Sequence, residues 1–297
     1  MNDPLPLERL LARAESLLGR LEAVLPPAPE APDWQSAIAF RWRKNANRGW
    51  LQPIRQPHPI RLSDLETIDD QKERVVANTR QFVAGKTANN VLLTGARGSG
   101  KSSLVKAVLS EFSGNGLRVI EVDKSDLVDL PDIVDLLDGR PEKFIIFCDD
   151  LSFDAGETAY KALKSVLDGS IAAPPDNVLI YATSNRRHLM PEYFAENLET
   201  HTVNDEIRPG ETTEEKVSLS DRFGLWVSFY PFSQDDYLAV FQHWARELGV
   251  ADSVIAAAER EALNWSLGRG SRSGRVAWQF AKDLAGRQPS TSEKGTP

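Results

Sequence analysis

The stretch LLTGARGSGKSSL, residues 92–104, decides the fold of this chain. It fits the pattern G-x-x-x-x-G-K-[ST], with Gly95, Gly100, Lys101 and Ser102 at the fixed positions. An apolar run precedes it and a run with helical spacing follows, which is the strand–loop–helix setting where this motif works. Its glycines let backbone N–H groups converge on phosphate oxygens, and the start of the helix adds the positive end of its dipole. The sequence therefore predicts a phosphate-binding loop rather than an ordinary glycine-rich turn.

This loop supplies most of a predicted nucleotide site. We expect Lys101 to reach the β- and γ-phosphates and the Ser102 hydroxyl to bind Mg²⁺. The nucleotide-binding residues predicted in the loop are Gly95, Ala96, Arg97, Gly98, Ser99, Gly100, Lys101, Ser102 and Ser103.

Two later strand-like runs end in polar residues suited to nucleotide chemistry. The run FIIFCDD, residues 144–150, ends in Asp149, which can hold Mg²⁺ through water, and Asp150, which can orient or deprotonate an attacking water. A protein that only binds nucleotide needs the first carboxylate and not the second. The run LIYATSN ends in Asn185, which is placed either to touch the γ-phosphate or that water, or simply to end a strand.

Strand-like and helix-like runs alternate from residue 90 onward, and this alternation predicts an α/β fold with a parallel sheet covered on both faces. After Pro231 the strands stop, and an S-x-x-D start signal at Ser233 and Asp236 opens the first of three predicted helices. These helices predict a small C-terminal helical domain. The predicted strands are residues 90–94, 117–123, 143–150, 177–185 and 225–230, and the helices between them are 101–113, 131–138 and 156–168.

The N-terminal part has two unusual segments. Residues 5–25 have leucines at helical spacing between charged residues, which predicts an amphipathic helix, and PPAPEAP (26–32) reads as a stiff linker. The helix either folds back over an apolar groove or serves docking or oligomerisation. Residues 34–61 are basic and aromatic, a composition typical of a single-strand nucleic-acid surface. It is equally typical of an irregular arm with buried aromatics and arginines paired to an acidic body, the interpretation we favour.

Composition narrows the class of protein. The chain has 297 residues, 41% hydrophobic and 26% charged, as in soluble globular proteins, and no apolar run approaches the ~20 residues that cross a bilayer. The N-terminus lacks the pattern of a signal peptide, and the single cysteine, Cys148, fits a reducing cytoplasm. The histidines are scattered and suggest no zinc site. A net charge of −8 argues against wrapping nucleic acid along the whole surface, although a local basic patch is compatible with it.

The motifs GARGSGKS, FIIFCDD, YATSN, SDRFG (220–224) and SGRVA (273–277) resemble, in order, Walker A, Walker B, sensor 1, the arginine finger and sensor 2 of AAA+ ATPases. The resemblance implies ATP and Mg²⁺ as ligands, Arg222 as the finger, Arg275 as the sensor-2 residue with Arg272 as a rival, and Ile68 in the adenine pocket. It also implies assembly into a ring or spiral, because the finger usually reaches a neighbouring subunit. AAA+ enzymes have Asp-Glu in Walker B, whereas this chain has Asp-Asp. The shorter Asp150 carboxylate is expected to sit roughly 1 Å further from the water unless the strand end shifts, and such misplacement can cost ~10²-fold.

Residues 34–286 resemble more closely a bacterial family of predicted AAA+ ATPases, domain of unknown function 815, through segments such as AFRWR, CDDLSF and EEKVSLSDRFGL. The expected function is Mg²⁺-dependent ATP hydrolysis coupled to remodelling or loading of a macromolecular partner. The alternatives are a nucleotide switch with negligible turnover and a loader that acts on nucleic acid. The long acid-rich insert 186–220 is a candidate adaptor element. The expected segments are 1–33 (helix and linker), 34–61 (basic arm), 62–231 (nucleotide domain), 232–286 (lid) and 287–297 (disordered tail).

Overall fold

The computed structural model describes residues 6–24, 31–45, 48–153, 157–169, 175–186, 189, 201–203, 206–208 and 219–288. The chain divides into two compact units, Met1–Pro32 and Asp33–Pro297. In the first unit the predicted amphipathic helix is confirmed as α1, Pro6–Val24. Residues 25–30 of the predicted linker and 289–297 of the predicted tail lie outside the described residues.

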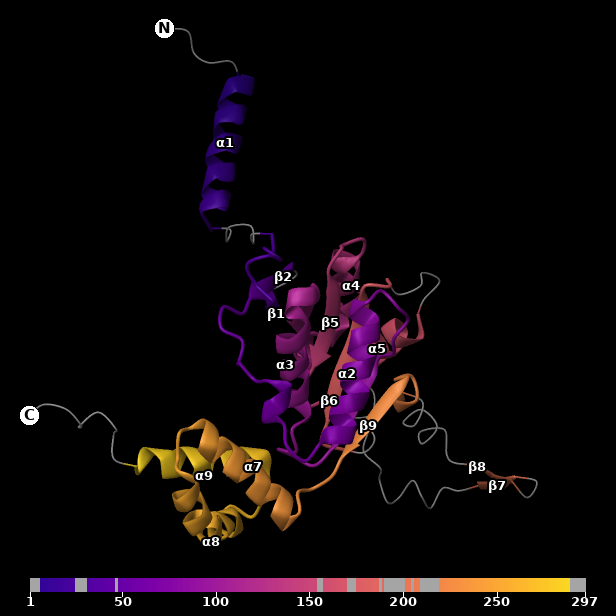
Figure 1. The fold of residues 1–297 in the computed structure, drawn as a ribbon. Coiled ribbons are helices and arrows are strands. Elements are labelled where there is room, and N and C mark those ends of the chain that lie inside the picture. Colours follow the sequence, from indigo (N-terminus) through magenta and orange to yellow (C-terminus); the bar gives the residue numbers. More distant parts are fainter. Residues whose placement is uncertain are drawn as a thin grey trace, which may run out of the picture. The chain divides into compact units, whose positions relative to one another are not determined.

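The second unit is built on a seven-stranded sheet with the order β2-β1-β4-β5-β6-β3-β9 (Figure 1). Strand β2 runs antiparallel to β1, and the other neighbouring pairs are parallel. The predicted α/β class and each predicted strand are confirmed. The strands are β1 (Ala39–Asn45), β2 (Arg48–Pro53), β3 (Val91–Gly95), β4 (Leu117–Glu121), β5 (Lys143–Cys148), β6 (Val178–Ser184) and β9 (Leu225–Phe229).

Alternate residues of the strands pack into two separate cores. In β5, Phe144 and Ile146 point to one core and Ile145 and Phe147 to the other, as the two-residue period of a strand requires. One core is closed by α4 (Leu130–Leu137) and α5 (Thr158–Asp168), and the other by α2 (Asp69–Val83) and α3 (Lys101–Phe112). Short 3-10 turns η1 (Leu62–Asp64), η2 (Ser113–Asn115) and η3 (Lys124–Asp129) join these elements. Because both sheet faces are covered, the strands read as nearly continuous apolar runs.

Residues 39–45 and 48–53 of the basic and aromatic arm form two strands of the sheet, so the expectation of an irregular segment is wrong there, whereas the expected buried aromatics and paired basic residues are found. Phe40 and Trp42 on β1 are buried, while Arg41 between them pairs with Glu121 of β4 at 2.7 Å. Lys44 reaches Asp129 at 2.5 Å. The alternation of aromatic and basic residues in AFRWR is therefore the alternation of a strand with one buried face.

The C-terminal helices pack around their own core, and Figure 1 shows them gathered in one cluster, coloured orange to yellow. The predicted start signal is confirmed, since Ser233 Oγ accepts a hydrogen bond from the Asp236 N–H at 3.1 Å at the first helix. Ser273 caps the last helix in the same way. The helices are α7 (Gln234–Glu247), α8 (Asp252–Gly268) and α9 (Gly274–Gly286). They form the predicted helical lid.

The acid-rich insert lies largely outside the described residues. Its described parts include an antiparallel strand pair, β7 (His201–Val203) and β8 (Glu206–Arg208). Among the described residues, none of the helices has the length and apolar content that crossing a membrane requires.

Candidate nucleotide-binding site

The predicted phosphate loop joins the end of β3 to the start of α3, at the point where the chain leaves the middle of the sheet. Gly95, Gly98 and Gly100 have φ angles of 128°, 72° and 101°, which residues other than glycine rarely adopt. A Cβ atom at Gly95 would lie 1.8 Å from the Phe229 carbonyl oxygen of β9. The glycine spacing that identifies the motif is thus required by the backbone path.

Lys101 lies at the first turn of α3 and is buried, with its side chain folded over the loop. Its Nζ donates hydrogen bonds to the carbonyl oxygens of Gly95 (2.8 Å) and Ala96 (2.7 Å) and to Asn185 Oδ1 (3.1 Å). Burial lowers the pKa of the Lys101 ammonium, while the charges of Asp149 and Asp150 act in the opposite direction. A partly desolvated cation in the first turn of a helix is a site suited to an anion.

Asp149 is held by two hydroxyl groups. Ser102 Oγ and Thr183 Oγ1 each donate a hydrogen bond to Asp149 Oδ1, both at 2.6 Å. Ser102 and Asp149, the two predicted metal ligands, are therefore in direct contact. A hydroxyl and one carboxylate suit Mg²⁺, which commonly takes its remaining oxygens from water and phosphates. Among the described residues, no three His, Cys, Asp or Glu side chains are grouped as a metal site.

Thr183 is a site residue that the sequence motifs did not identify. It is buried in β6, accepts the Asp150 N–H at 2.8 Å on its hydroxyl, and accepts the Leu151 N–H at 2.7 Å on its carbonyl. It thereby fixes the chain that leaves β5. Its position two residues before Asn185, on a strand next to β5, is the signal that could have found it.

Asp150 and Asn185 meet at the same edge of the sheet. Asn185 Nδ2 donates a hydrogen bond to Asp150 Oδ1, and Arg97 Nη2 lies 3.5 Å from Asp150 Oδ2. The backbone of Asp150 is left-handed, with φ 54°, a conformation that Asp tolerates better than most residues. The strand end therefore turns at Asp150 instead of continuing straight.

A cavity of about 800 Å³ opens between the phosphate loop and the lid. Ile68 lines it, as do Ile60 and Leu65, and the lid contributes Trp244 and Trp278. The two indole centroids lie 4.7 Å apart in an edge arrangement. The sequence pattern carried no sign of these tryptophans, because their approach to the loop depends on where the lid packs. The loop and strand-end residues that line the cavity are Arg97, Gly98, Ser99, Gly100, Lys101, Ser102, Ser103, Asp149, Asp150 and Asn185.

The lid contacts the phosphate loop through backbone atoms. The Gly274 N–H, at the start of α9, donates a hydrogen bond to the Gly98 carbonyl oxygen at 2.8 Å. A Cβ at Gly98 would lie 2.7 Å from Ser273 Cβ, so glycine is needed for this approach. At another point of the lid, Arg61 pairs with Glu247 of α7.

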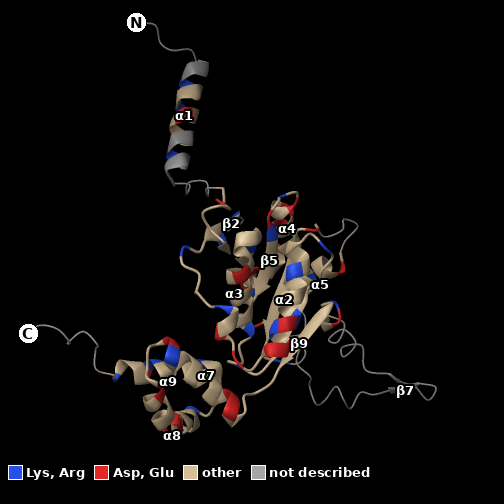
Figure 2. Cartoon of the chain, viewed as in Figure 1, with Lys and Arg blue, Asp and Glu red and all other residues tan. Residues whose placement is uncertain are grey.

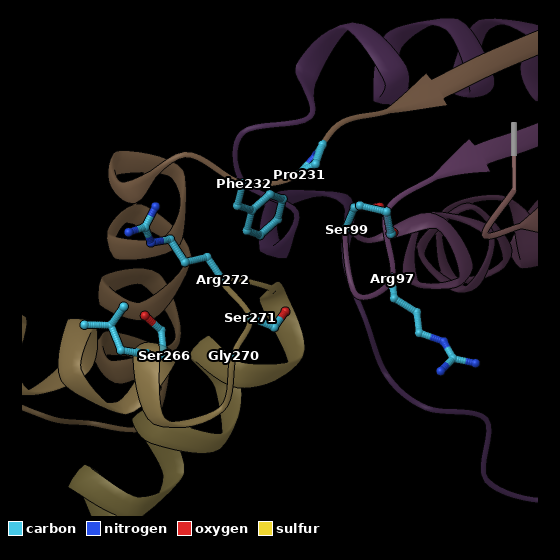
Figure 3. A pocket seen from close by; sticks show the side chains of 10 residues that line it. Arg97, Ser99, Pro231, Phe232, Ser266, Gly270, Ser271 and Arg272 are labelled. Carbon is cyan, nitrogen blue, oxygen red and sulfur yellow. The ribbon is translucent and has the colours of Figure 1, made fainter.

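Arg275 and Arg272, the rivals for the sensor-2 role, line different cavities. Arg275 lines the cavity that holds the loop, Asp149 and Asp150. Arg272 lines a neighbouring cavity of about 530 Å³, and Figure 3 shows its guanidinium directed away from Arg97 and Ser99. The geometry favours Arg275.

Arg222 does not line this cavity. Its Nε donates a hydrogen bond to Asp168 at the end of α5. The structure therefore separates the predicted finger from the rest of the predicted site within one subunit.

Three of the six basic residues in the arm form ion pairs with the body of the domain, while Arg48 and Arg55 are exposed. Arg41, Lys44 and Arg61 are each ion-paired to a carboxylate, and the Trp42 indole N–H donates a hydrogen bond to Asp129 at 3.1 Å. In the view of Figure 2, basic and acidic residues are interspersed over the second unit. These contacts fit the packing role better than a nucleic-acid surface.

Comparison with known proteins identifies the family and the fold of this chain. The family described as protein of unknown function DUF815 matches residues 35–288. The Aeropyrum pernix Orc1 protein, solved in complex with DNA, is similar over 77% of this chain and 65% of its own, with 15% identity and a TM-score of 0.50. The Thermotoga maritima RuvB Holliday junction branch migration motor is similar over 75% and 63%, with 18% identity and a TM-score of 0.47. No curated protein matches the sequence. This chain spans less than two thirds of the length of these solved structures. At 15% identity, the likeness to the Orc1 protein shows a shared fold alone.

Proposed function

The chain belongs to the DUF815 family, and from the geometry of the site we propose that it binds ATP with Mg²⁺ and hydrolyses it. The observation that carries the proposal is the convergence of Lys101, the Ser102–Asp149 pair and the Asp150–Asn185 pair at one edge of the sheet. A cavity of about 800 Å³ beside them is in the range of pockets that hold ligands of this size.

Each group has a role in binding. The loop and Lys101 would neutralise phosphate charge, and Ser102 and Asp149 would hold Mg²⁺, which would supply further positive charge next to the phosphates. The apolar walls formed by Ile68, Trp244 and Trp278 suit a purine base. Burial lowers the pKa of Lys101, and the carboxylates of Asp149 and Asp150 oppose that shift and so favour the charged form that phosphate binding requires.

Asp150 and Asn185 are the groups that would act on water. Asp150 accepts its proton and Asn185 orients it, since both lie at the strand ends next to Lys101. The left-handed turn at Asp150 supports this role, because it changes the direction from which the short carboxylate approaches the site. Arg275 stabilises the negative charge that develops on the transferred phosphoryl group.

Arg222 completes the site from a neighbouring subunit in this proposal. Its absence from the cavity lining of its own subunit supports a role in trans, and the chain then assembles into a ring or spiral. Nucleotide state changes the lid through the Gly98–Gly274 contact and remodels or loads a macromolecular partner. The acid-rich insert is the proposed contact for that partner.

Calorimetric titration with ATP and Mg²⁺, together with a phosphate-release assay, tests the proposal. Lys101→Ala should abolish ATP binding, and circular dichroism must show that it stays folded, because the change also removes three hydrogen bonds of a buried side chain. Lys161→Ala, which removes an exposed lysine on α5, should bind normally. Asp150→Asn should bind ATP and release no phosphate. Undiminished ATP affinity in Lys101→Ala would remove the nucleotide from this loop.

A nucleotide switch with negligible turnover is the second candidate. The contacts of Asp150 with Asn185 and Arg97 favour it, because a carboxylate held by an amide and a guanidinium is less free to turn toward an attacking water. Wild-type protein that binds ATP but releases no phosphate, alone and assembled, would establish the switch in place of the ATPase.

A further inference from the structure

Helix α1 has an exposed apolar face. Leu10, Leu11 and Leu17 are 68%, 54% and 50% exposed. Successive residues of an α-helix are rotated by ~100° about the helix axis. Viewed along that axis, Leu17 and Leu11 lie at the two edges of an apolar arc about 120° wide, and Leu10 and Ala14 lie between them. An amphipathic helix gains most of its stability by burying such an arc against a partner.

Charges of opposite sign flank the two edges of this arc. Arg13 lies about 40° and Arg20 about 60° beyond Leu17, and Glu15 lies about 40° beyond Leu11, on the other side. In the sequence, Glu8 and Glu22 stand seven residues before and after Glu15, which is a heptad spacing. Figure 2 shows both signs of charge on α1. One flank is therefore basic and the other acidic.

This pattern is complementary to itself in one orientation only. When two parallel helices face each other through such arcs, the basic flank of each opposes the acidic flank of the other on both sides. In an antiparallel pair, Arg13 and Arg20 would instead face the arginines of the second copy, and Glu15 would face glutamate. Like charges in these positions destabilise a helix pair, so the flanks select the parallel arrangement.

We propose that α1 is a self-association element in which the helices of two or more copies of this chain pack in parallel through the arc of Leu10, Leu11, Ala14 and Leu17. This inference rests on the proposed function, in which several copies of the chain assemble. It identifies α1 as a segment through which these copies are joined. A balanced pair of charged flanks suits a second copy better than a partner of one charge sign. It also gives little attraction to an anionic lipid surface, which needs an excess of basic residues.

The contact is weak for a single pair of helices. A helix of 19 residues has fewer than three heptads, and coiled coils of this length are marginal in water. Copies already assembled through the second unit hold their α1 helices at a high effective concentration, which strengthens the same contact.

Disulfide cross-linking in the full-length chain tests the arrangement. The native Cys148 is buried, and burial raises the pKa of its thiol to about 12, so it does not compete with an added surface cysteine. Leu10→Cys should form a disulfide-linked dimer under mild oxidation, because equivalent residues meet only in the parallel arrangement. Ser16→Cys, at an exposed position away from the arc, is the control and should form little. Absence of a Leu10→Cys dimer would overturn the proposal.

Reversal of the flanking charges tests whether the apolar arc of α1 binds a second copy of this chain or something else. In the Leu10→Cys background, Arg13→Glu with Arg20→Glu makes both flanks acidic and should reduce cross-linking about 10- to 100-fold through repulsion. Glu8→Arg, Glu15→Arg and Glu22→Arg together make both flanks basic and should reduce it likewise, and an equimolar mixture of the two variants should restore a mixed dimer. Cross-linking that the reversals leave unchanged, or a mixture that restores nothing, would overturn the proposal and leave the arc to another protein or to a membrane.

ATP binding and phosphate release of each variant are measured in parallel. A Leu10→Cys chain that forms no dimer but binds and hydrolyses ATP normally contradicts this inference alone, whereas undiminished ATP affinity in Lys101→Ala contradicts only the proposed function.

Discussion

Replacing Thr183 by Val tests whether the site depends on the strand next to Asp149. The change keeps the shape of a buried side chain but removes its hydroxyl, which donates to Asp149 Oδ1 at 2.6 Å and accepts the Asp150 N–H at 2.8 Å. A hydrogen bond to a charged group contributes about 1.5–3 kcal/mol, and a buried N–H left without an acceptor costs about 1–3 kcal/mol. We therefore expect the free energy of unfolding to fall by about 2–4 kcal/mol, allowing for partial replacement by water.

The same substitution should weaken metal binding. Groups that orient a metal ligand typically contribute 10- to 100-fold in affinity, so the Mg²⁺ concentration that supports half-maximal ATP binding should rise by about that factor. Urea unfolding followed by circular dichroism and calorimetric ATP titrations at a series of Mg²⁺ concentrations measure the two effects. Thr183→Ser is the control, because it retains the hydroxyl. Thr183→Val protein with unaltered stability and unaltered Mg²⁺ dependence would refute the assignment.

Other substitutions test the loop, the lid and the finger. Gly95→Ala should lower the free energy of unfolding by at least about 2 kcal/mol, because its Cβ would meet the Phe229 carbonyl oxygen at 1.8 Å; Gly114→Ala, with no atom within 4 Å, should stay within about 0.5 kcal/mol in the same urea assay. Trp244→Ala should weaken ATP binding by about tenfold through lost stacking but leave inorganic triphosphate binding unchanged, and an equal effect on both ligands would contradict a base-binding wall. Trp265→Ala, which removes a lid tryptophan outside the cavity lining, controls for lid stability in these titrations. Arg222→Ala should keep ATP affinity and lose about 10³-fold in phosphate release, and mixing it with Lys101→Ala should recover part of the rate. Co-assembled material that recovers nothing would place Arg222 in its own subunit's site.

The phosphate loop and the helical lid could be predicted because their signals are local. Gly95 and Gly100 are required by the path of a few consecutive residues, and Ser233 with Asp236 closes a capping box within one turn. Such contacts depend on near neighbours in sequence. Thr183 could not be assigned in this way, because its role follows from the register that sets Cys148 of β5 opposite Ala182 of β6.

The two strands of the basic and aromatic arm were not predicted for a different reason. Arg41 and Trp42 carry both a strand pattern and a composition typical of nucleic-acid surfaces, and the composition masks the alternation. The acceptors that pair with its charges, Glu121 and Asp129, lie about 80 residues further along the chain. The place of Trp244 and Trp278 in the cavity could not be predicted for a related reason. The sequence of a lid helix shows that it has an apolar face, but not which part of that face meets the loop.

The Gly98–Gly274 hydrogen bond has a consequence for how this family can change over time. Because both partners are backbone groups, exchange of side chains on the outer surface of the lid leaves the link intact. A side chain at Gly98 would clash with Ser273, and proline at Gly274 would remove the N–H donor. These substitutions at the two glycines therefore break the hydrogen bond, whereas substitutions elsewhere on the lid surface do not. Side chains on the outer surface of the lid can therefore be exchanged without loss of the backbone link between the loop and the lid.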